Sequence, residues 1–284
     1  MPRIIIKHAS ALLLALITIA TAPAASCADR IVSLVPSVTE TLFALGVGDQ
    51  VVGVSSYDDY PPDVKNLPKV GSFLTPNLEA IAALRPTIVI GRGISSNQRE
   101  IRALRAMGYE ILMIEDDSLP QIEQSIRLIG TRVGKSQQAN AIIAGIEANV
   151  NDVRTRVHPF PARRTLMLVG HQPIVAVGPG TFLDDLFKIA GAENIADAAA
   201  QQWPQLSMEF IVAMRPEVII DGQMGSDPES PTQFWDAYPT IPAVRNRRVV
   251  GYPEDPTLHP GPRVGTTLEM IAKLIHPEAW KTAR

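Results

Sequence analysis

A segment of twelve residues occurs twice in this chain, and the two copies constrain the fold more than any other feature. Residues 79–90 return as residues 209–220, 130 positions later, with six identities and three further positions of matched apolar character. In each copy an amphipathic segment ends at Arg-Pro and a short apolar run follows. Because proline disfavours the helical conformation in the residue before it, each copy predicts a short helix followed by a buried strand. One half of the chain therefore resembles the other.

A glutamate opens the helix in both copies, Glu79 in the first and Glu209 in the second. A carboxylate at this position interacts favourably with the positive end of the helix dipole, so stabilisation of the helix is one interpretation. The alternative is that two equivalent lobes each present one carboxylate on the same side of the molecule, as the two arms of a clamp would. The residues alone leave both interpretations open.

The first 28 residues have the composition of a secretory signal peptide. Two basic residues precede an apolar run at 11–20, and small residues follow it. The run is shorter than the roughly 20 residues that a membrane-spanning helix needs. We therefore expect export to the periplasm, with a mature chain that begins near Asp29. Cleavage before Cys27, the only cysteine, would instead leave a lipid anchor at that residue.

Charge and motifs exclude several classes of function. The formal net charge is −3 and no basic cluster is found, so nucleic acid is not an expected partner. The chain lacks the Gly-x-Ser-x-Gly, His-Glu-x-x-His and glycine-rich phosphate-binding motifs, and its five histidines are scattered. We expect no catalysis and no resident cofactor or metal.

Periodicity divides the mature chain into two α/β halves and a helical connector. Apolar strands alternate with amphipathic helices over residues 29–118 and again over 159–284, which is typical of parallel sheets covered by helices. Between them, residues 119–158 have apolar residues at helical spacing, with a break allowed at 134–136. The predicted fold class is α/β, with two Rossmann-like lobes that have parallel sheets and are joined by a single long α-helix. We expect the protein to be monomeric.

Several aromatic residues lie in predicted loops rather than in the periodic elements. Tyr57 and Tyr60 follow the second strand, and Phe73 and Trp203 each lie six residues before the glutamate of their repeat copy. Open α/β sheets bind ligands at such strand ends. Packing of the loop is the simpler explanation for any single aromatic. The equivalent placement of Phe73 and Trp203 nevertheless predicts that the two face each other across a cleft and hold a flat ligand.

Four segments carry a resemblance to a known family: residues 30–40, residues 52–62, which end in Ser-Ser-Tyr-Asp-Asp-Tyr-Pro-Pro, residues 77–86 and residues 203–209. They resemble the periplasmic substrate-binding proteins of ABC importers, in the vitamin B12-binding branch of the helical-backbone metal-chelate receptors. The resemblance covers essentially the whole mature chain. It implies that the protein binds cobalamin or a related corrinoid between two lobes and delivers it to a permease dimer with its ATPase subunits.

The resemblance also implies roles for individual residues. Tyr57, Phe73 and Trp203 correspond to the corrinoid cleft, and Tyr60 lies in the same loop as Tyr57. Glu79 and Glu209 correspond to the two carboxylates that pair with arginines on the two permease subunits. These roles are compatible with helix capping, because one side chain can do both.

The chain departs from this branch in two places, which keeps other ligands open. It has Gly-Arg-Gly at 91–93, where members of the branch carry an aromatic, and an unusual loop begins at His171. His171 and His259 are candidates for the cleft, either as axial ligands of a bound metal or as packing residues, and Asp255 is a candidate acceptor for ligand amides. Haem or a ferric siderophore is the alternative cargo, and Arg92 would suit a haem propionate. An exported enzyme or a sensor domain is the more distant alternative.

Overall fold

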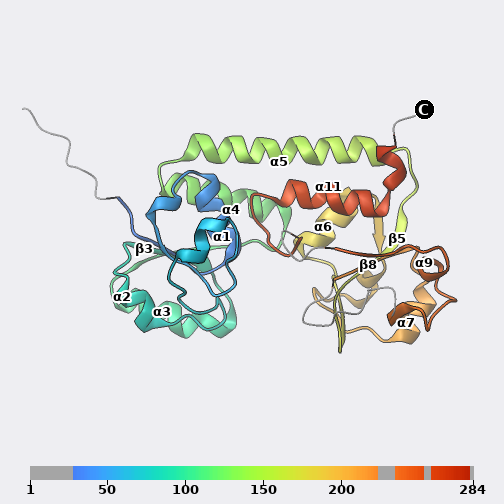
Figure 1. Cartoon of the computed structure of the whole chain (residues 1–284), viewed down its shortest axis with the longest axis horizontal. Coiled ribbons are helices and arrows are strands. Elements are labelled where there is room, and N and C mark those ends of the chain that lie inside the picture. Colours follow the sequence, from blue (N-terminus) through green and yellow to red (C-terminus); the bar gives the residue numbers. More distant parts are fainter. Residues whose placement is uncertain (1–27, 223–233, 253–256, 282–284) are drawn as a thin grey trace, which may run out of the picture.

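The computed structural model describes residues 28–222, 234–252 and 257–281. Figure 1 shows two α/β halves that hang below one long helix, α5 (Ser136–Val157), which runs along the top of both. The predicted fold class, two α/β lobes with parallel sheets joined by one long helix, is confirmed. Residues 1–27 of the expected signal peptide, with Cys27, and the candidate Asp255 lie outside the described residues.

The N-terminal sheet has four strands in the order β2-β1-β3-β4, and every pairing is parallel. Successive residues of β3 face opposite sides, so Ile88 and Ile90 join the core under α5 while Val89 joins the core under α3. Both faces are thus buried, which explains the continuous apolar runs in the sequence. The elements of this half are β1 (Ile31–Ser33), α1 (Pro36–Ala44), β2 (Val51–Gly53), α2 (Leu78–Ala83), β3 (Ile88–Arg92), α3 (Gln98–Ala106) and β4 (Glu110–Ile114).

The C-terminal sheet has five strands in the order β6-β5-β8-β9, with β7 also paired to β5. All pairings are parallel except that of the β5–β6 hairpin. Strand β8 repeats the pattern of β3, because Val218 and Ile220 face the shared core while Ile219 faces the opposite side. The elements of this half are β5 (Arg163–His171), β6 (Ile174–Ala176), α6 (Phe182–Ile189), β7 (Ala192–Asn194), α7 (Met208–Met214), β8 (Val218–Asp221), α9 (Pro242–Arg245), β9 (Val249–Gly251) and α11 (Val264–Ile275).

The helical segment between the halves consists of two helices, α4 (Leu119–Arg132) and α5. They separate at Gly134, whose φ of +69° is adopted most readily by glycine, and this falls within the break that the sequence allowed. Helix α5 packs on α4 at one end and on α11 at the other. Its 22 residues span about 33 Å, enough to cross both halves. One continuous apolar core runs from β1 through α5 to α11, so the two halves share it.

Short 3₁₀ helices occur in the connections between these elements and after α11. They are η1 (Gly48–Gln50), η2 (Pro62–Asn66), η3 (Ser95–Asn97), η4 (Ile195–Ala199) and η5 (Pro277–Trp280).

The two repeat copies have the same local structure. Asn77 caps α2 by accepting a hydrogen bond from the backbone of Ala80 (3.0 Å), and Ser207 caps α7 through Phe210 in the same way (3.2 Å). The arginine before each proline has left-handed backbone geometry, with φ of 45° at Arg85 and 51° at Arg215. Both helices therefore turn into their strands by the same route, as the repeat predicted.

Candidate functional site

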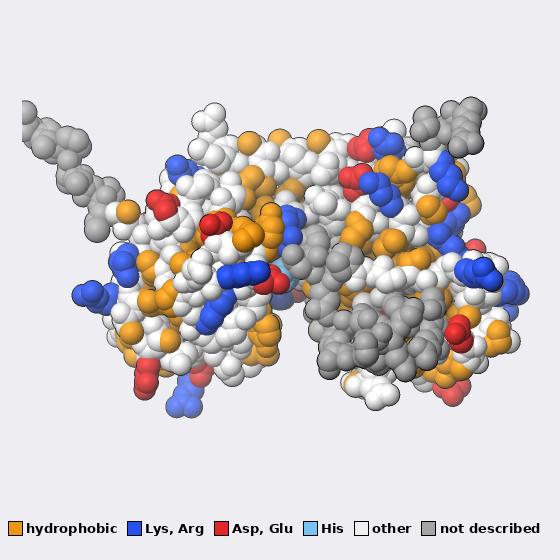
Figure 2. Space-filling view, viewed as in Figure 1, with side chains coloured by type: hydrophobic (Ala, Val, Ile, Leu, Met, Phe, Trp, Pro, Cys, Tyr) orange, Lys and Arg blue, Asp and Glu red, His pale blue; other side chains and the backbone are white. Residues whose placement is uncertain are grey.

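A cavity of about 430 Å³ lies between the two halves. Both halves contribute walls, and Figure 2 shows that the surface is notched between them below α5. The N-terminal wall contains one aromatic and three charged side chains, whereas the C-terminal wall is mostly apolar. The N-terminal residues are Phe73, Arg92, Asp116 and Asp117, and those of the C-terminal half include Val169, Val175, Thr181, Phe182, Trp203, Leu258 and Pro260.

Phe73 and Trp203, which the repeat predicted to face each other, line this one cavity from opposite halves. Trp203 is 46% exposed, and Tyr57, at 58%, lies beside Phe73 with ring centroids 6.4 Å apart. Large apolar side chains that remain open to solvent in a cavity commonly mark a place that a ligand covers. The structure thus brings three of the predicted aromatics to one region, and their contact with a ligand stays a prediction.

Asn97, which sequence reasoning missed, holds two residues of the cavity in position. Its side-chain amide donates hydrogen bonds to the backbone carbonyls of Phe73 (2.8 Å) and Arg92 (2.9 Å), and its oxygen accepts one from the backbone N–H of Ile94 (3.1 Å). The side chain is completely buried. A polar group that is buried and fully hydrogen-bonded fixes local geometry, because the loss of any partner leaves an unsatisfied group.

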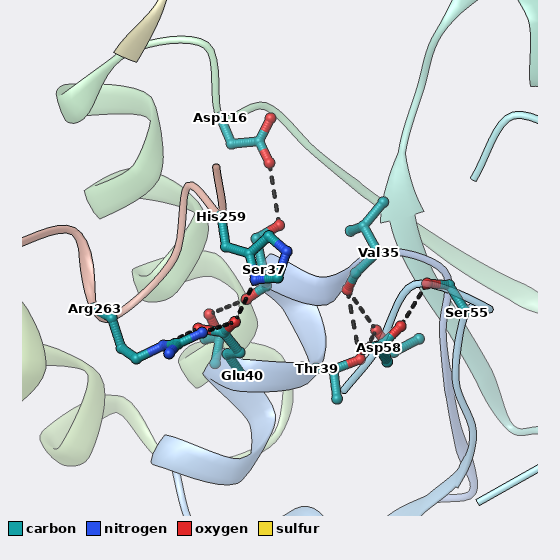
Figure 3. Close-up of polar contacts among 11 residues, drawn as sticks. Val35, Ser37, Thr39, Glu40, Ser55, Asp58, Asp116, His259 and Arg263 are labelled. Carbon is teal, nitrogen blue, oxygen red and sulfur yellow. Dashed lines mark hydrogen bonds and ion pairs between the residues drawn. The ribbon is translucent and has the colours of Figure 1, made fainter. Parts of the chain in front are cut away.

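Three charged residues form one corner of the cavity at the carboxyl ends of β3 and β4. Arg92 forms ion pairs with Asp116, at 3.1 Å from Nε to Oδ1, and with Asp117. The hydroxyl of Ser37, at the start of α1, donates to the other oxygen of Asp116 (3.1 Å), as Figure 3 shows. Burial raises the pKa of Asp116, and the positive charge of Arg92 opposes that rise.

The loop that carries Tyr57 is anchored by a buried carboxyl group. Asp58 is only 4% exposed and accepts a hydrogen bond from the hydroxyl of Ser55, drawn in Figure 3. Lys69 donates to the backbone carbonyl of Asp58 (2.6 Å). Burial raises the pKa of Asp58, and its hydrogen bond with Ser55 acts in the opposite direction. The Ser-Ser-Tyr-Asp-Asp-Tyr motif therefore folds around Asp58, which leaves Tyr57 exposed.

Tyr60 lies elsewhere, although it belongs to the same loop. The guanidinium of Arg263 sits over its ring, 3.9 Å from the centroid. Both residues line a second cavity of about 710 Å³, bordered by α1, α5 and α11. The structure thus separates Tyr60 from Phe73 and Trp203, and it engages the Tyr60 ring in a cation–π contact instead.

His259 contacts the N-terminal half rather than the cavity between the halves. Its Nδ1 lies 2.9 Å from Oε1 of Glu40 on α1, and Arg263 donates to both carboxylate oxygens of Glu40 (2.6 and 2.8 Å). Figure 3 shows this cluster between α1 and the loop that leads to α11. The side chain of Glu40 is 1% exposed. Leu258 and Pro260, the sequence neighbours of His259, line the cavity between the halves, whereas His259 itself joins the two halves.

His171 also has partners of its own. Its Nε2 lies 2.7 Å from the buried carboxylate of Asp221, which accepts a further hydrogen bond from the indole N–H of Trp235 (2.7 Å). Its ring stacks on Phe234 with centroids 4.4 Å apart. Among the described residues, those that line the cavity between the halves do not include His171. The arrangement fits a packing and hydrogen-bonding role within the C-terminal half.

Glu79 and Glu209 are exposed in the first turns of α2 and α7. Figure 1 shows these helices at the ends of the two halves that lie away from α5. The pKa of Glu209 is lowered mainly by a hydrogen bond from its own backbone N–H, and to a smaller extent by one from the hydroxyl of Ser207. Each half therefore presents one carboxylate from the same position of the same repeated unit.

The described residues contain neither a cluster of metal ligands nor a membrane-spanning helix. No group of three or more His, Cys, Asp or Glu side chains in residues 28–222, 234–252 and 257–281 is arranged to hold a metal ion. Within the same residues, no helix is both long enough and apolar enough to cross a membrane.

Known proteins resemble this chain over most of its length. A family model described as periplasmic binding protein matches residues 31–256. A vitamin B12-binding protein of Yersinia pestis is 30% identical over 84% of each chain. The solved periplasmic haem-binding protein RhuT of Roseiflexus sp. RS-1 is 30% identical with a TM-score of 0.80, over 89% of this chain and 100% of that one. The periplasmic vitamin B12-binding protein BtuF of Vibrio cholerae is 26% identical with a TM-score of 0.78, over 89% and 98%.

Proposed function

This chain belongs to the periplasmic binding protein family, and on that premise we propose that it captures cobalamin or a related corrinoid in the periplasm and delivers it to an ABC importer. The observation that carries the proposal is the cavity between the halves, with Phe73 and Trp203 on opposite walls. The vitamin B12-binding proteins among its relatives support the choice of cargo.

Binding energy in this proposal comes mainly from the aromatic walls. A flat macrocycle between Phe73 and Trp203 would cover apolar surface that is now open to solvent, and Tyr57 would extend the wall beside Phe73. Aromatic side chains supply large contact areas at low entropic cost, and a few polar groups at the cavity edge fix orientation. The protein binds its ligand and performs no chemistry on it.

Haem is the second candidate cargo, and two observations favour it. The haem-binding protein RhuT resembles this chain as closely as the vitamin B12-binding proteins do, and Arg92 lines the cavity where a propionate could reach it. Against this, Arg92 is already paired with Asp116 and Asp117. The two carboxylates reduce its attraction for an acidic ligand, which is why a corrinoid is our first choice.

Delivery requires contact with a permease, and the exposed carboxylates of the two repeat copies suit that contact. Glu79 and Glu209 stand at equivalent places on the two halves, where two permease subunits could each bind one. The core shared by both halves through α5 supports small rather than large movements of the halves on ligand binding. We propose a monomer that is exported by its signal peptide.

Equilibrium dialysis of residues 29–284 against cyanocobalamin and, in parallel, hemin tests the cargo. Each ligand has visible absorbance, so the reading does not depend on tryptophan fluorescence. We expect saturable submicromolar binding of cyanocobalamin, and a loss of at least about tenfold in affinity for Trp203→Ala and Phe73→Ala, because each variant removes one aromatic wall.

Trp280→Phe is the matched control, because Trp280 lies at the far end of α5 between Arg156 and Lys273. Its affinity should equal that of the wild type. If hemin binds and cyanocobalamin does not, the cargo is haem, and the proposed binding cavity stands. Binding of either ligand with unchanged affinity in both cavity variants would refute the proposed site.

A further inference from the structure

We propose that Arg92, Asp116 and Asp117 form an acceptor corner of the cavity that selects ligands with carboxamide N–H groups over ligands with carboxylates. This inference rests on the proposed function and specifies the chemistry that the same site recognises. It concerns the edge groups of a flat ligand rather than the identity of its ring or metal.

The corner is built by two neighbouring parallel strands. Arg92 is the last residue of β3 and pairs in register with Ile114, the last residue of β4, so Asp116 and Asp117 follow two and three residues beyond that edge. All three side chains line the cavity. Ligands of α/β proteins bind outside the carboxyl ends of the strands, which is where this corner lies.

The guanidinium of Arg92 is already engaged by acids of the protein. Its Nε lies 3.1 Å from Asp116 Oδ1, and its Nη2 pairs with Asp117. Arginine recognises a carboxylate best when it offers two parallel N–H groups to both oxygens. Two carboxylates beside one guanidinium also give the corner no net positive charge. A ligand carboxylate would therefore meet competing acids instead of an available arginine.

Asp116 supplies an acceptor that needs a donor. Asp116 is 3% exposed, and its Oδ2 accepts a hydrogen bond from the hydroxyl of Ser37. Within the described part of the chain, its Oδ1 has no hydrogen-bond partner of good geometry, although Arg92 Nε is 3.1 Å away. A buried acceptor without a donor is costly to leave unmatched. A carboxamide N–H at the cavity edge would satisfy this oxygen, whereas a ligand carboxylate offers no hydrogen.

A matched pair of ligands tests the corner independently of the cargo. Hemin and its bis-carboxamide share ring and metal and differ only in whether two edge groups are acids or amides. We expect the wild type to bind the bis-carboxamide at least about tenfold more tightly than hemin, the effect of roughly one hydrogen bond to a charged group. Cyanocobalamin and its monocarboxylic acid form a second pair with the same expected order.

Variants then assign the preference to the corner. Asp117→Asn should reduce the preference for the amide, and Asp116→Asn with Asp117→Asn should abolish or reverse it, because Arg92 becomes available to a carboxylate. Asp49→Asn with Asp236→Asn removes the same charge from two exposed positions outside the cavity, and it should keep the wild-type preference. Thermal unfolding of each variant verifies that it is folded.

The outcomes separate this inference from the proposed function. If cyanocobalamin binds and its monocarboxylic acid binds with equal affinity, the acceptor corner is overturned and the proposed cargo stands. Amide preference in the hemin pair without any cobalamin binding supports the corner and overturns the corrinoid cargo. An unchanged preference in the folded double variant also overturns the corner, and failure of all four ligands to bind overturns both.

Discussion

The Nδ1 atom of His259 lies 2.9 Å from Oε1 of Glu40, although the two residues are 219 positions apart in the chain. Glu40 belongs to the first helix of the N-terminal half, and His259 to the loop before the last helix. Arg263 binds the same carboxylate, so a single acid of one half holds two side chains of the other (Figure 3). This cluster and the shared core beneath α5 fix how the halves meet.

Replacement of Glu40 should destabilise the whole molecule. Glu40→Ala leaves Arg263 without this buried partner, and we expect a loss of about 2–4 kcal/mol in the free energy of unfolding, measured by urea denaturation. Glu147→Ala, at an exposed position of α5, is the control and should change stability by less than about 0.5 kcal/mol. Equal denaturation midpoints for the wild type and Glu40→Ala would contradict the role of the cluster.

Asn97 should affect ligand binding without contacting the ligand. Asn97→Ala leaves the carbonyls of Phe73 and Arg92 without their donor, so we expect a loss of about 1–3 kcal/mol in stability and a clear loss of ligand affinity. Denaturation and dialysis measure the two effects on the same sample. Asn151→Ala, exposed on α5, should alter neither. Full ligand affinity in a destabilised Asn97→Ala protein would show that the loop of Phe73 is held by other contacts.

Asp58 should contribute more to stability in mild acid than at neutral pH. Burial raises its pKa in the folded state above the ordinary 3.8, so the folded state retains a proton that the unfolded state releases. The stability contribution of this group is therefore fully present below pH 3.8 and is lost as pH rises through the folded-state pKa.

Asp58→Asn should remove that dependence. Urea denaturation over pH 4 to 8 should show the stability of the wild type falling relative to the variant as pH rises, by at most about 1.4 kcal/mol per pH unit. Asp49→Asn, which removes one exposed negative charge, controls for net charge. A constant difference between the wild type and Asp58→Asn over this range would rule out the effect.

Reversing the charges of Glu79 and Glu209 should impair delivery of the ligand to the importer without impairing ligand binding. With Glu79→Arg and Glu209→Arg together, we expect uptake through the importer to fall at least about tenfold, because like charges would meet at the docking surface. Ligand affinity should stay within about twofold of the wild type, since neither residue lines the cavity. Uptake of radiolabelled ligand and dialysis provide the two readings.

Glu147→Arg with Glu193→Arg makes the same change in net charge at other exposed positions, and it should transport normally. A loss of ligand affinity in the Glu79 and Glu209 variant, or a matching transport defect in this control, would count against permease docking at the repeat.

Local patterns determined much of this fold. The Arg-Pro pairs predicted the change from helix to strand, and Arg85 and Arg215 have the same left-handed geometry there. Gly134 interrupts the helical connector where the sequence allowed a break. The equal offset of Phe73 and Trp203 from their repeat predicted a shared location, and both line one cavity. Such features follow from residues near in sequence, or from a repeated unit that folds twice in the same way.

Only the tertiary structure decided which charged and polar groups meet. Nothing near Glu40 in the sequence identifies His259 or Arg263 as its partners, and the same holds for Asp221 beside His171. Tyr57 and Tyr60 are three residues apart, yet one lies by Phe73 and the other under Arg263. Asp116 could have been suspected from its place beyond a strand end, but its pairing with Arg92 depends on strand order and register. Periodicity records which side of an element is buried, whereas long-range partners are set by how the elements pack.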